Sequence, residues 1–278
     1  MQVYTIQTGN FKLDGGAMFG VVPKSIWNKL NPADENNLCS WAMRCLLIQE
    51  GDRLILVDNG IGNKQDAKFF SHYYLHGEDT LDKSLQKLGF HRNDITDVLL
   101  THLHFDHCGG SIIRENDKLI PAFVNARYWS HTSHWDWAIR PNAREKASFL
   151  YENIIPIQES GQLHLVDQHA PKFPSFINIH LMQGHTDSMM LPEIMYKGRP
   201  LIFMADLIPS AAHLPLPYVM AYDMFPMKTL MEKDNFLKKA LERDAILFFE
   251  HDPQIECVSL QQTEKGIRMN EHFSLDAI

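Results

Sequence analysis

The strongest constraint on the fold is a set of short apolar runs, each bounded by turn residues. Runs of three to five residues that are apolar almost throughout are typical of strands buried on both faces. The predicted strands cover 45–48, 54–57, 98–100, 177–181, 201–204 and 246–249. Potential ligands and catalytic groups, mostly histidine and aspartate, follow several of these runs directly. Because loops at one end of a rigid sheet can converge, we expect these groups to form one site.

Helical patterns lie between the predicted strands. Leu81, Leu85 and Leu88 repeat at helical spacing, with Asp79 or Thr80 as the N-cap and Gly89 at the end. A second apolar stripe consists of Met227, Leu230, Met231, Leu237 and Leu241. Strands mixed with helices along the whole chain predict an α/β architecture.

The organisation of the chain favours a single domain over residues 1–278. The sequence contains no internal repeat and no Gly/Ser-rich linker, and 45% of its residues are hydrophobic. Proline-containing stretches at 153–175 and 209–226 are expected to be long connections.

Charge and cysteine content exclude several classes of protein. With 26 basic and 34 acidic residues the net charge is −8, which disfavours nucleic acid as a partner. No apolar stretch reaches the roughly 20 residues of a membrane span, and the N-terminus lacks the order of a secretory signal. We therefore expect a cytoplasmic protein without a membrane partner. The four cysteines form no CxxC pair, so we expect free thiols.

The segment 102–110, HLHFDHCGG, contains the pattern HxHxDH. In a chain of this composition the pattern is expected by chance roughly 0.003 times. His102 and His104 point the same way in extended or turning backbone, while Asp106 and His107 project from the following turn. Two adjacent metal positions are therefore within reach, and Gly109 and Gly110 are expected to allow a tight turn beneath them.

Three more donors stand at the ends of predicted strands. They are His185 in the triplet GHT, Asp206 and His251. Together with the four donors of HxHxDH they make seven.

The order of these motifs resembles that of the metallo-β-lactamase superfamily of binuclear metallohydrolases, and Asp58 in LVDNG resembles the aspartate of its early strand-turn. The resemblance implies a four-layer αβ/βα sandwich. It also implies that His102, His104 and His185 hold one metal, that Asp106, His107 and His251 hold the second, and that Asp206 bridges them. Asp58 is expected to orient a ligand histidine, with a plain turn aspartate as the alternative.

The ligand types favour two divalent ions, zinc first, with Mn, Fe or Co as competitors. Two such ions can share a hydroxide that attacks an electrophilic carbonyl or phosphorus, and Asp106 is expected to pass a proton to the leaving group. The substrate is therefore expected to be a small molecule.

The run HLHFDHCGG and the stretch GAMFG at 16–20 most resemble the acyl-homoserine lactonases and related organophosphate hydrolases. The loop 207–225 is also similar to that branch and could supply a substrate contact from His213, Tyr218 or Tyr222, with His213 favoured. The alternative is a proline-rich crossing loop without such a role. Two departures from the family pattern are Asp187-Ser188 after GHT and Glu250 before His251.

Other functions stay open at this stage. A thioester hydrolase of the glyoxalase II type shares HxHxDH, but Lys265 and Arg268 are thin support for a glutathione site. A non-catalytic metal-binding domain is a second alternative, a metal-dependent nuclease is disfavoured by the charge, and a homodimer is possible. His131 and His134 are expected to be packing residues. The remaining histidines are expected to be structural or on the surface: His72, His76, His91, His164, His169, His180 and His272.

Overall fold

The computed structural model describes residues 1–167, 170 and 172–278, so the expectation for His169 lies outside the described residues. The chain forms two compact units. Unit 1 comprises Met1–Gly9 and Met43–Pro174, and unit 2 comprises Asn10–Ala42 and Ser175–Ile278. The expectation of one domain over 1–278 stays a prediction.

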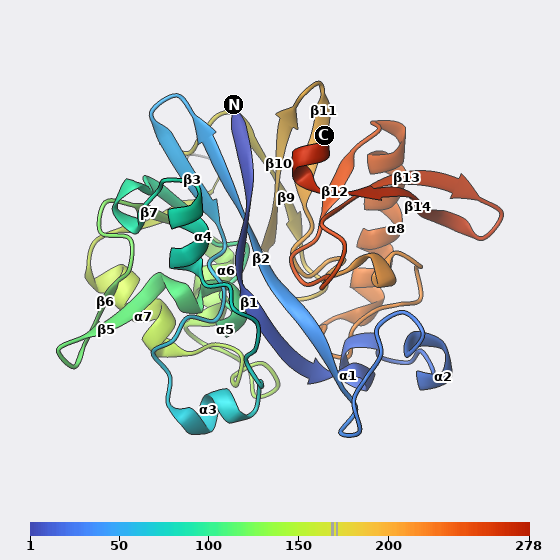
Figure 1. Ribbon diagram of the computed structural model, residues 1–278, viewed down its shortest axis with the longest axis horizontal. Coiled ribbons are helices and arrows are strands. Elements are labelled where there is room, and N and C mark those ends of the chain that lie inside the picture. Colours follow the sequence, from blue (N-terminus) through green and yellow to red (C-terminus); the bar gives the residue numbers. More distant parts are fainter. Residues whose placement is uncertain (168–169, 171) are drawn as a thin grey trace. The chain divides into compact units, whose positions relative to one another are not determined.

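Unit 1 is built on a six-stranded sheet in the order β1-β2-β3-β4-β7-β8, seen with its helices in Figure 1. The strands are β1 (Gln2–Asp14), β2 (Leu38–Glu50), β3 (Arg53–Val57), β4 (Asp97–Leu99), β7 (Arg127–His131) and β8 (Leu163–Val166), the first two of which also include residues of unit 2. β3, β4, β7 and β8 are parallel, whereas β2 pairs with β3 antiparallel. The carboxyl ends of the parallel strands therefore lie at one edge of the sheet.

The helices of unit 1 are α3 (Ala67–Ser71), α4 (Leu81–Lys87), α5 (Phe105–Cys108), α6 (Thr132–Ala138) and α7 (Tyr151–Glu159), with short 3-10 turns at Arg92–Asp94 and Gly109–Ser111. α4 confirms the predicted helix. Thr80 is its N-cap and accepts a hydrogen bond from the Lys83 amide, while Leu81 and Leu85 are buried in the core.

The expectation that 153–175 is a long connection is wrong in two places, because α7 covers Tyr151–Glu159 with Pro156 inside it and β8 covers Leu163–Val166. Asn153, Ile154 and Ile157 are buried on its inner face. Packing of that face offsets the backbone hydrogen bond that the proline cannot donate.

Unit 2 contains a second six-stranded sheet, in the order β14-β13-β12-β11-β10-β9. Its strands are β9 (Ile177–Met182), β10 (Met189–Tyr196), β11 (Arg199–Phe203), β12 (Ile246–Phe248), β13 (Cys257–Thr263) and β14 (Gly266–Phe273). Only β11 and β12 are parallel among these pairs. The helices are α1 (Gly15–Phe19), α2 (Lys24–Trp27) and α8 (Pro226–Glu242), with 3-10 turns at Ala211–His213 and Leu275–Ala277.

The second predicted helix is confirmed as α8, but its predicted buried face is partly wrong. Met227 and Met231 are 74% and 58% exposed. The buried face instead follows a neighbouring stripe of mixed polarity: Thr229, Lys233, Phe236, Leu237 and Ala240. A stripe drawn from apolar residues alone missed it because two of its members are polar.

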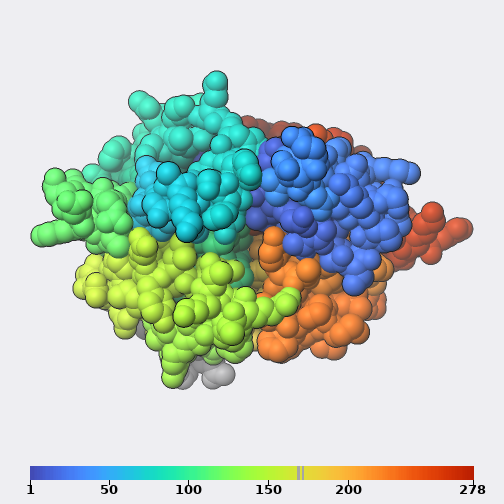
Figure 2. Space-filling model, turned by 90° about the horizontal axis from the view of Figure 1, so that it is seen from below, coloured from blue at the N-terminus to red at the C-terminus, as the bar shows by residue number. Residues whose placement is uncertain are grey.

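All six predicted strands are present, and the α/β class is confirmed. The remaining strands carry weaker patterns. Two hairpins among them project from their units, β5 (Ile112–Glu115) with β6 (Lys118–Pro121) in green and β13 with β14 in red (Figures 1 and 2). All four cysteines are buried, and none of them forms a disulfide within the part of the chain that the structure describes. None of the helices in the described residues combines the length and the apolar character that a membrane crossing needs.

Candidate metal centre

The four donors of HxHxDH lie just beyond the carboxyl end of β4. His102 lies in the loop after the strand, His104 is the N-cap of α5, and Asp106 and His107 belong to α5 itself. All four side chains are buried, the most exposed being Asp106 at 8%. The strand-to-helix turn therefore gathers them at one place in unit 1, as the spacing predicted.

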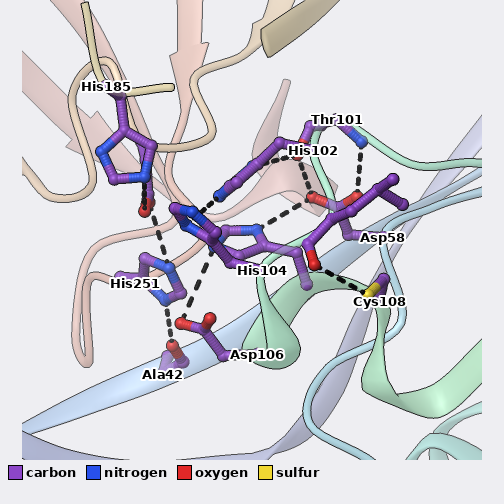
Figure 3. Close-up of polar contacts among 12 residues, drawn as sticks. Ala42, Asp58, Thr101, His102, His104, Asp106, Cys108, His185 and His251 are labelled. Carbon is purple, nitrogen blue, oxygen red and sulfur yellow. Dashed lines mark hydrogen bonds and ion pairs between the residues drawn. The ribbon is translucent and has the colours of Figure 1, made fainter. Parts of the chain in front are cut away.

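The inner nitrogens of the three rings face one another. His102 Nε2 lies 3.1 Å from His104 Nδ1, and the ring centres of His102 and His107 are 3.9 Å apart. The Asp106 carboxylate lies 3.7 Å from His107 Nε2. Figure 3 shows the rings of His102 and His104 turned towards each other.

The outer nitrogens of the same rings are held by protein oxygens. His107 Nδ1 lies 3.1 Å from Asp58 Oδ2, and His104 Nε2 lies 2.9 Å from Glu145 Oε1. His102 Nδ1 lies 3.1 Å from the Thr101 hydroxyl, which in turn donates to Asp58 at 2.6 Å (Figure 3). Such outer contacts fix the ring orientation of metal-binding histidines. The contact of Asp58 with a candidate ligand histidine is therefore present, and its role in orienting a metal ligand stays a prediction.

Gly109 and Gly110 have a different role from the one expected. The φ of Gly109 is −61°, which any residue can adopt. A Cβ on Gly109 would instead meet the Ile61 carbonyl oxygen at 2.1 Å, and one on Gly110 would meet the Asn59 carbonyl at 2.2 Å. The glycines are therefore needed because the segment after β3 packs directly against the metal-binding loop, not because the loop turns tightly.

His185, Asp206 and His251 lie beyond the ends of β9, β11 and β12 in unit 2. The two oxygens of Asp206 face the two rings, at 3.1 Å from His185 Nε2 and 3.2 Å from His251 Nε2. All three side chains are buried. The strand ends of this sheet therefore bring together the three donors that the sequence placed there.

The outer nitrogens are again held by oxygens. His185 Nδ1 lies 2.8 Å from Asp223 Oδ1, and His251 Nδ1 donates to the Ala42 carbonyl at 2.8 Å (Figure 3). Burial lowers the pKa of His185, but the carboxylates of Asp206 and Asp223 outweigh it and raise the pKa to about 10. Two carboxylates thus favour a positive charge at this ring, and a bound metal ion would replace its proton.

The loop that carries His185 is held by α8. Both oxygens of Glu232 accept backbone hydrogen bonds, from Gln183 at 2.8 Å and from Gly184 at 3.0 Å. A Cβ on Gly184 would lie 2.3 Å from Thr229 Oγ1, so a glycine is required here. Because these contacts precede His185, the departure from the family pattern at 187–188 does not remove its support.

The loop 207–225 places its three candidate residues differently. His213 is fully buried; its Nδ1 lies 2.8 Å from the Ser210 hydroxyl, its Nε2 lies 2.9 Å from the Met18 carbonyl oxygen, and its ring stacks on Phe19 with centres 4.5 Å apart. Burial lowers its pKa to about 3, so the ring is neutral at ordinary pH. Tyr218 is half-buried and Tyr222 is 38% exposed.

Several supporting residues had no signal in the sequence. Glu145, Asp223 and Glu232 stand outside every motif, and each holds a candidate ligand or its backbone. His134, expected to be a packing residue, is buried and accepts a hydrogen bond from the Leu103 amide at 2.8 Å. It therefore also fixes the backbone between His102 and His104.

The donor chemistry fits a divalent metal ion. Each unit presents buried imidazole nitrogens and a carboxylate that converge, and the opposite ring nitrogens are held by oxygens. Nitrogen and oxygen donors without thiolate suit zinc and its neighbours in the first transition row.

Comparison with known proteins agrees with this chemistry. The family model of the metallo-beta-lactamase superfamily matches residues 44–251. The N-acyl homoserine lactonase AiiA of Bacillus thuringiensis subsp. kurstaki is 27% identical over 129 residues, covering 43% of this chain and 47% of that protein. The matched stretch thus spans about half the length of this curated relative.

Solved structures are similar over nearly the whole chain. A probable metal-dependent hydrolase from Staphylococcus aureus has a TM-score of 0.89 and 28% identity, covering 100% of this chain and 98% of that one. AidC, a dizinc quorum-quenching lactonase in complex with a product, has a TM-score of 0.77 and 26% identity, covering 98% and 95%. The predicted fold and the predicted resemblance to the lactonase branch are confirmed.

Proposed function

Because the chain belongs to the metallo-β-lactamase superfamily, we propose that it is a binuclear metal-dependent hydrolase that opens a lactone or a related small apolar ester. The observation that carries the proposal is the two-sided arrangement of the candidate histidines. In each unit, inner ring nitrogens face other donors while the outer nitrogens are held by protein oxygens. A polar loop without a metal has no need for this arrangement.

The proposed ligand assignment keeps all seven donors. His102, His104 and His185 hold one ion, Asp106, His107 and His251 hold the other, and Asp206 bridges them. Zinc is the first candidate, with Mn, Fe or Co as alternatives. A pair of ions bound there would lower the pKa of water, so that hydroxide is available at neutral pH, and would polarise the substrate carbonyl.

The residues of the chain transfer a proton and keep the metal ligands in place. Asp106 accepts the proton of the attacking water and returns it to the ring oxygen when the C–O bond breaks, so that lactone and water give a hydroxy acid. The outer contacts from Asp58, Glu145 and Asp223 keep the histidine rings from rotating, and thereby keep the donors in place during the reaction.

The substrate contact is assigned to the tyrosines of the loop 207–225. Both ring nitrogens of His213 lie within hydrogen-bond distance of protein oxygens, and its ring is fully buried. We therefore propose that His213 stabilises the conformation of the loop. Tyr222 and Tyr218 retain exposed surface, and a phenol can donate a hydrogen bond to a substrate oxygen.

The substrate class is proposed from the lactonases that this chain resembles: AidC is described as a quorum-quenching lactonase, and the Bacillus thuringiensis relative as an N-acyl homoserine lactonase. A cytoplasmic location and a homodimer remain predictions.

The test compares the zinc-loaded protein on an acyl-homoserine lactone, a glutathione thioester and a phosphotriester. We expect the lactone to give the highest kcat/KM. Asp206→Ala should lose both bound metal and turnover, whereas Asp276→Ala, an exposed aspartate of the same unit, should keep both. Full metal content and turnover in Asp206→Ala would refute the mechanism. Preference for the thioester would favour the glyoxalase II type, and metal without any turnover would favour a binding domain.

A further inference from the structure

Unit 1 contains a surface hollow of about 540 Å³ whose lining is rich in cations. It is lined by Asn63, Lys64, Asp82, His91, Arg92, Ile113 and Arg114. Three of these residues carry a positive charge at neutral pH, and Asp82 is the only carboxylate. A lining of this kind contrasts with the net charge of −8 of the whole chain.

Lys64 is the most unusual residue of the hollow. Lys64 is only 7% exposed, and its ammonium donates a hydrogen bond to the Gly109 carbonyl at 2.6 Å. No carboxylate among the described residues forms an ion pair with it. An ammonium has three N–H donors, so two remain beyond the Gly109 contact.

A buried cation without a counterion is energetically unfavourable, because it loses hydration and gains no opposite charge. Burial is accordingly the largest effect on Lys64 and lowers its pKa to about 8, against smaller opposing effects of Cys108 and Glu152. A bound anion would supply the missing charge.

The other lining residues add donors. Arg92 binds Asp82 through Nε and Nη2, which leaves its Nη1 group for another acceptor. Arg114 has only a long contact of 3.5 Å with the exposed Glu152. His91 Nδ1 accepts a hydrogen bond from the Asn93 amide at 3.3 Å, so the proton of the neutral ring lies on Nε2.

We propose that this hollow binds a small oxyanion of the phosphate type. Lys64, Arg92 and Arg114 together carry three positive charges, against the carboxylate of Asp82 in the lining and that of Glu152 beside Arg114, which leaves an excess of one. A phosphate group offers three or four acceptor oxygens and matches the planar donors of arginine. The volume exceeds that of the bare ion, so a phosphate group carried by a small molecule also fits.

Lys64 connects the hollow with the candidate metal-binding loop. Lys64 binds the carbonyl of Gly109, two residues after His107, and the Asn59 amide donates to the carbonyl of His107 itself at 2.9 Å. An anion that keeps Lys64 charged would strengthen the bond to Gly109. Binding of the anion does not depend on the proposed lactone reaction.

The experiment is a calorimetric titration of the metal-loaded protein at constant ionic strength. Inorganic phosphate and glycerol phosphate distinguish a free ion from a carried phosphate group, and acetate serves as a monoanion. We expect saturable binding of a phosphate compound and at least tenfold weaker binding of acetate. Arg114→Gln should weaken the phosphate affinity at least tenfold without touching the Gly109 contact. Asp82→Asn should strengthen it severalfold, because the competing carboxylate is removed.

Arg140→Gln is the matched control, since it removes one positive charge from an exposed arginine of the same unit that is outside the hollow. The affinity of Arg140→Gln for phosphate should equal that of the unmodified protein. If phosphate binds equally well to Arg114→Gln, it is bound elsewhere, for example at the metal ions, and the proposal is overturned. A titration without a saturable binding signal would also overturn it. Lactone turnover is measured separately, so a failure of the proposed enzyme activity leaves the titration interpretable.

Discussion

Glu145 allows a test of whether the oxygens that contact the outer histidine nitrogens raise the affinity of the centre for metal. Its side chain is 1% exposed, and its Oε1 lies 2.9 Å from His104 Nε2. Removing such a partner from a metal-binding histidine typically costs 10- to 100-fold in metal affinity, which corresponds to about 1.4 to 2.8 kcal/mol. We therefore expect Glu145→Ala to bind zinc 10- to 100-fold more weakly, measured by competition with a chelator of known affinity.

The same carboxylate has a second, purely structural task that the test must separate. Its Oε2 accepts hydrogen bonds from Trp137 Nε1 at 2.6 Å and from Asn142 Nδ2 at 3.2 Å. Loss of these partners costs about 1 to 3 kcal/mol per buried group in folding stability. Trp137→Phe removes one of these contacts and keeps the contact with His104, so it should lose stability but keep its zinc affinity within about threefold of the unmodified protein.

Glu159→Ala, an exposed glutamate of the same unit, should change neither quantity. If Glu145→Ala loses stability in the metal-free state but binds zinc as the unmodified protein does, Glu145 only supports Trp137 and the reasoning fails. If Trp137→Phe loses as much zinc affinity as Glu145→Ala, the effect comes from general loosening of the unit and not from His104.

Two further predictions concern α8 and the loops it holds. Lys233 is fully buried, and burial lowers its pKa from 10.5 to about 7. Between these values the unfolded chain binds the proton and the folded chain does not, so stability should rise with pH, by about 2 kcal/mol from pH 7.5 to 9 relative to Lys233→Met. Urea unfolding at several pH values measures this, and a difference that stays flat with pH would mean that Lys233 is charged in the fold. Gly184→Ala would bring a Cβ to 2.4 Å from the Thr229 backbone nitrogen and should cost about 1 to 3 kcal/mol, with weaker zinc binding through His185. Unchanged melting temperature and zinc affinity in this variant would show that the loop can move away from α8 freely.

The sequence allowed the donors to be predicted because their positions follow local rules. HxHxDH is contiguous, and His185, Asp206 and His251 each stand after an apolar run that could be assigned as a strand. Glu145 and Asp223 could not be found in the same way. Each lies in a loop without periodicity, and each reaches its histidine through a tertiary contact between residues 41 and 38 positions apart.

The buried face of α8 was missed for a related reason. Hydrophobic periodicity marks a face only when its members are apolar, but Lys233 can be buried because its Nζ donates hydrogen bonds to the carbonyls of Pro215 and Tyr218. Met227 and Met231 are apolar yet exposed at the start of the helix. Burial here is decided by the available hydrogen-bond partners as well as by polarity.

The five candidate histidines do not have equivalent outer contacts. His104, His107 and His185 face carboxylates, whereas His102 faces a hydroxyl and His251 a backbone carbonyl. A carboxylate raises the basicity of the ring more than a neutral oxygen does, because its charge stabilises the positive charge that metal binding places on the imidazole. Metal affinity should therefore depend more on the three carboxylates than on the two neutral acceptors. Such carboxylates occur in both units, so replacing Asp58, Glu145 or Asp223 by alanine should weaken zinc binding more than replacing Thr101 does.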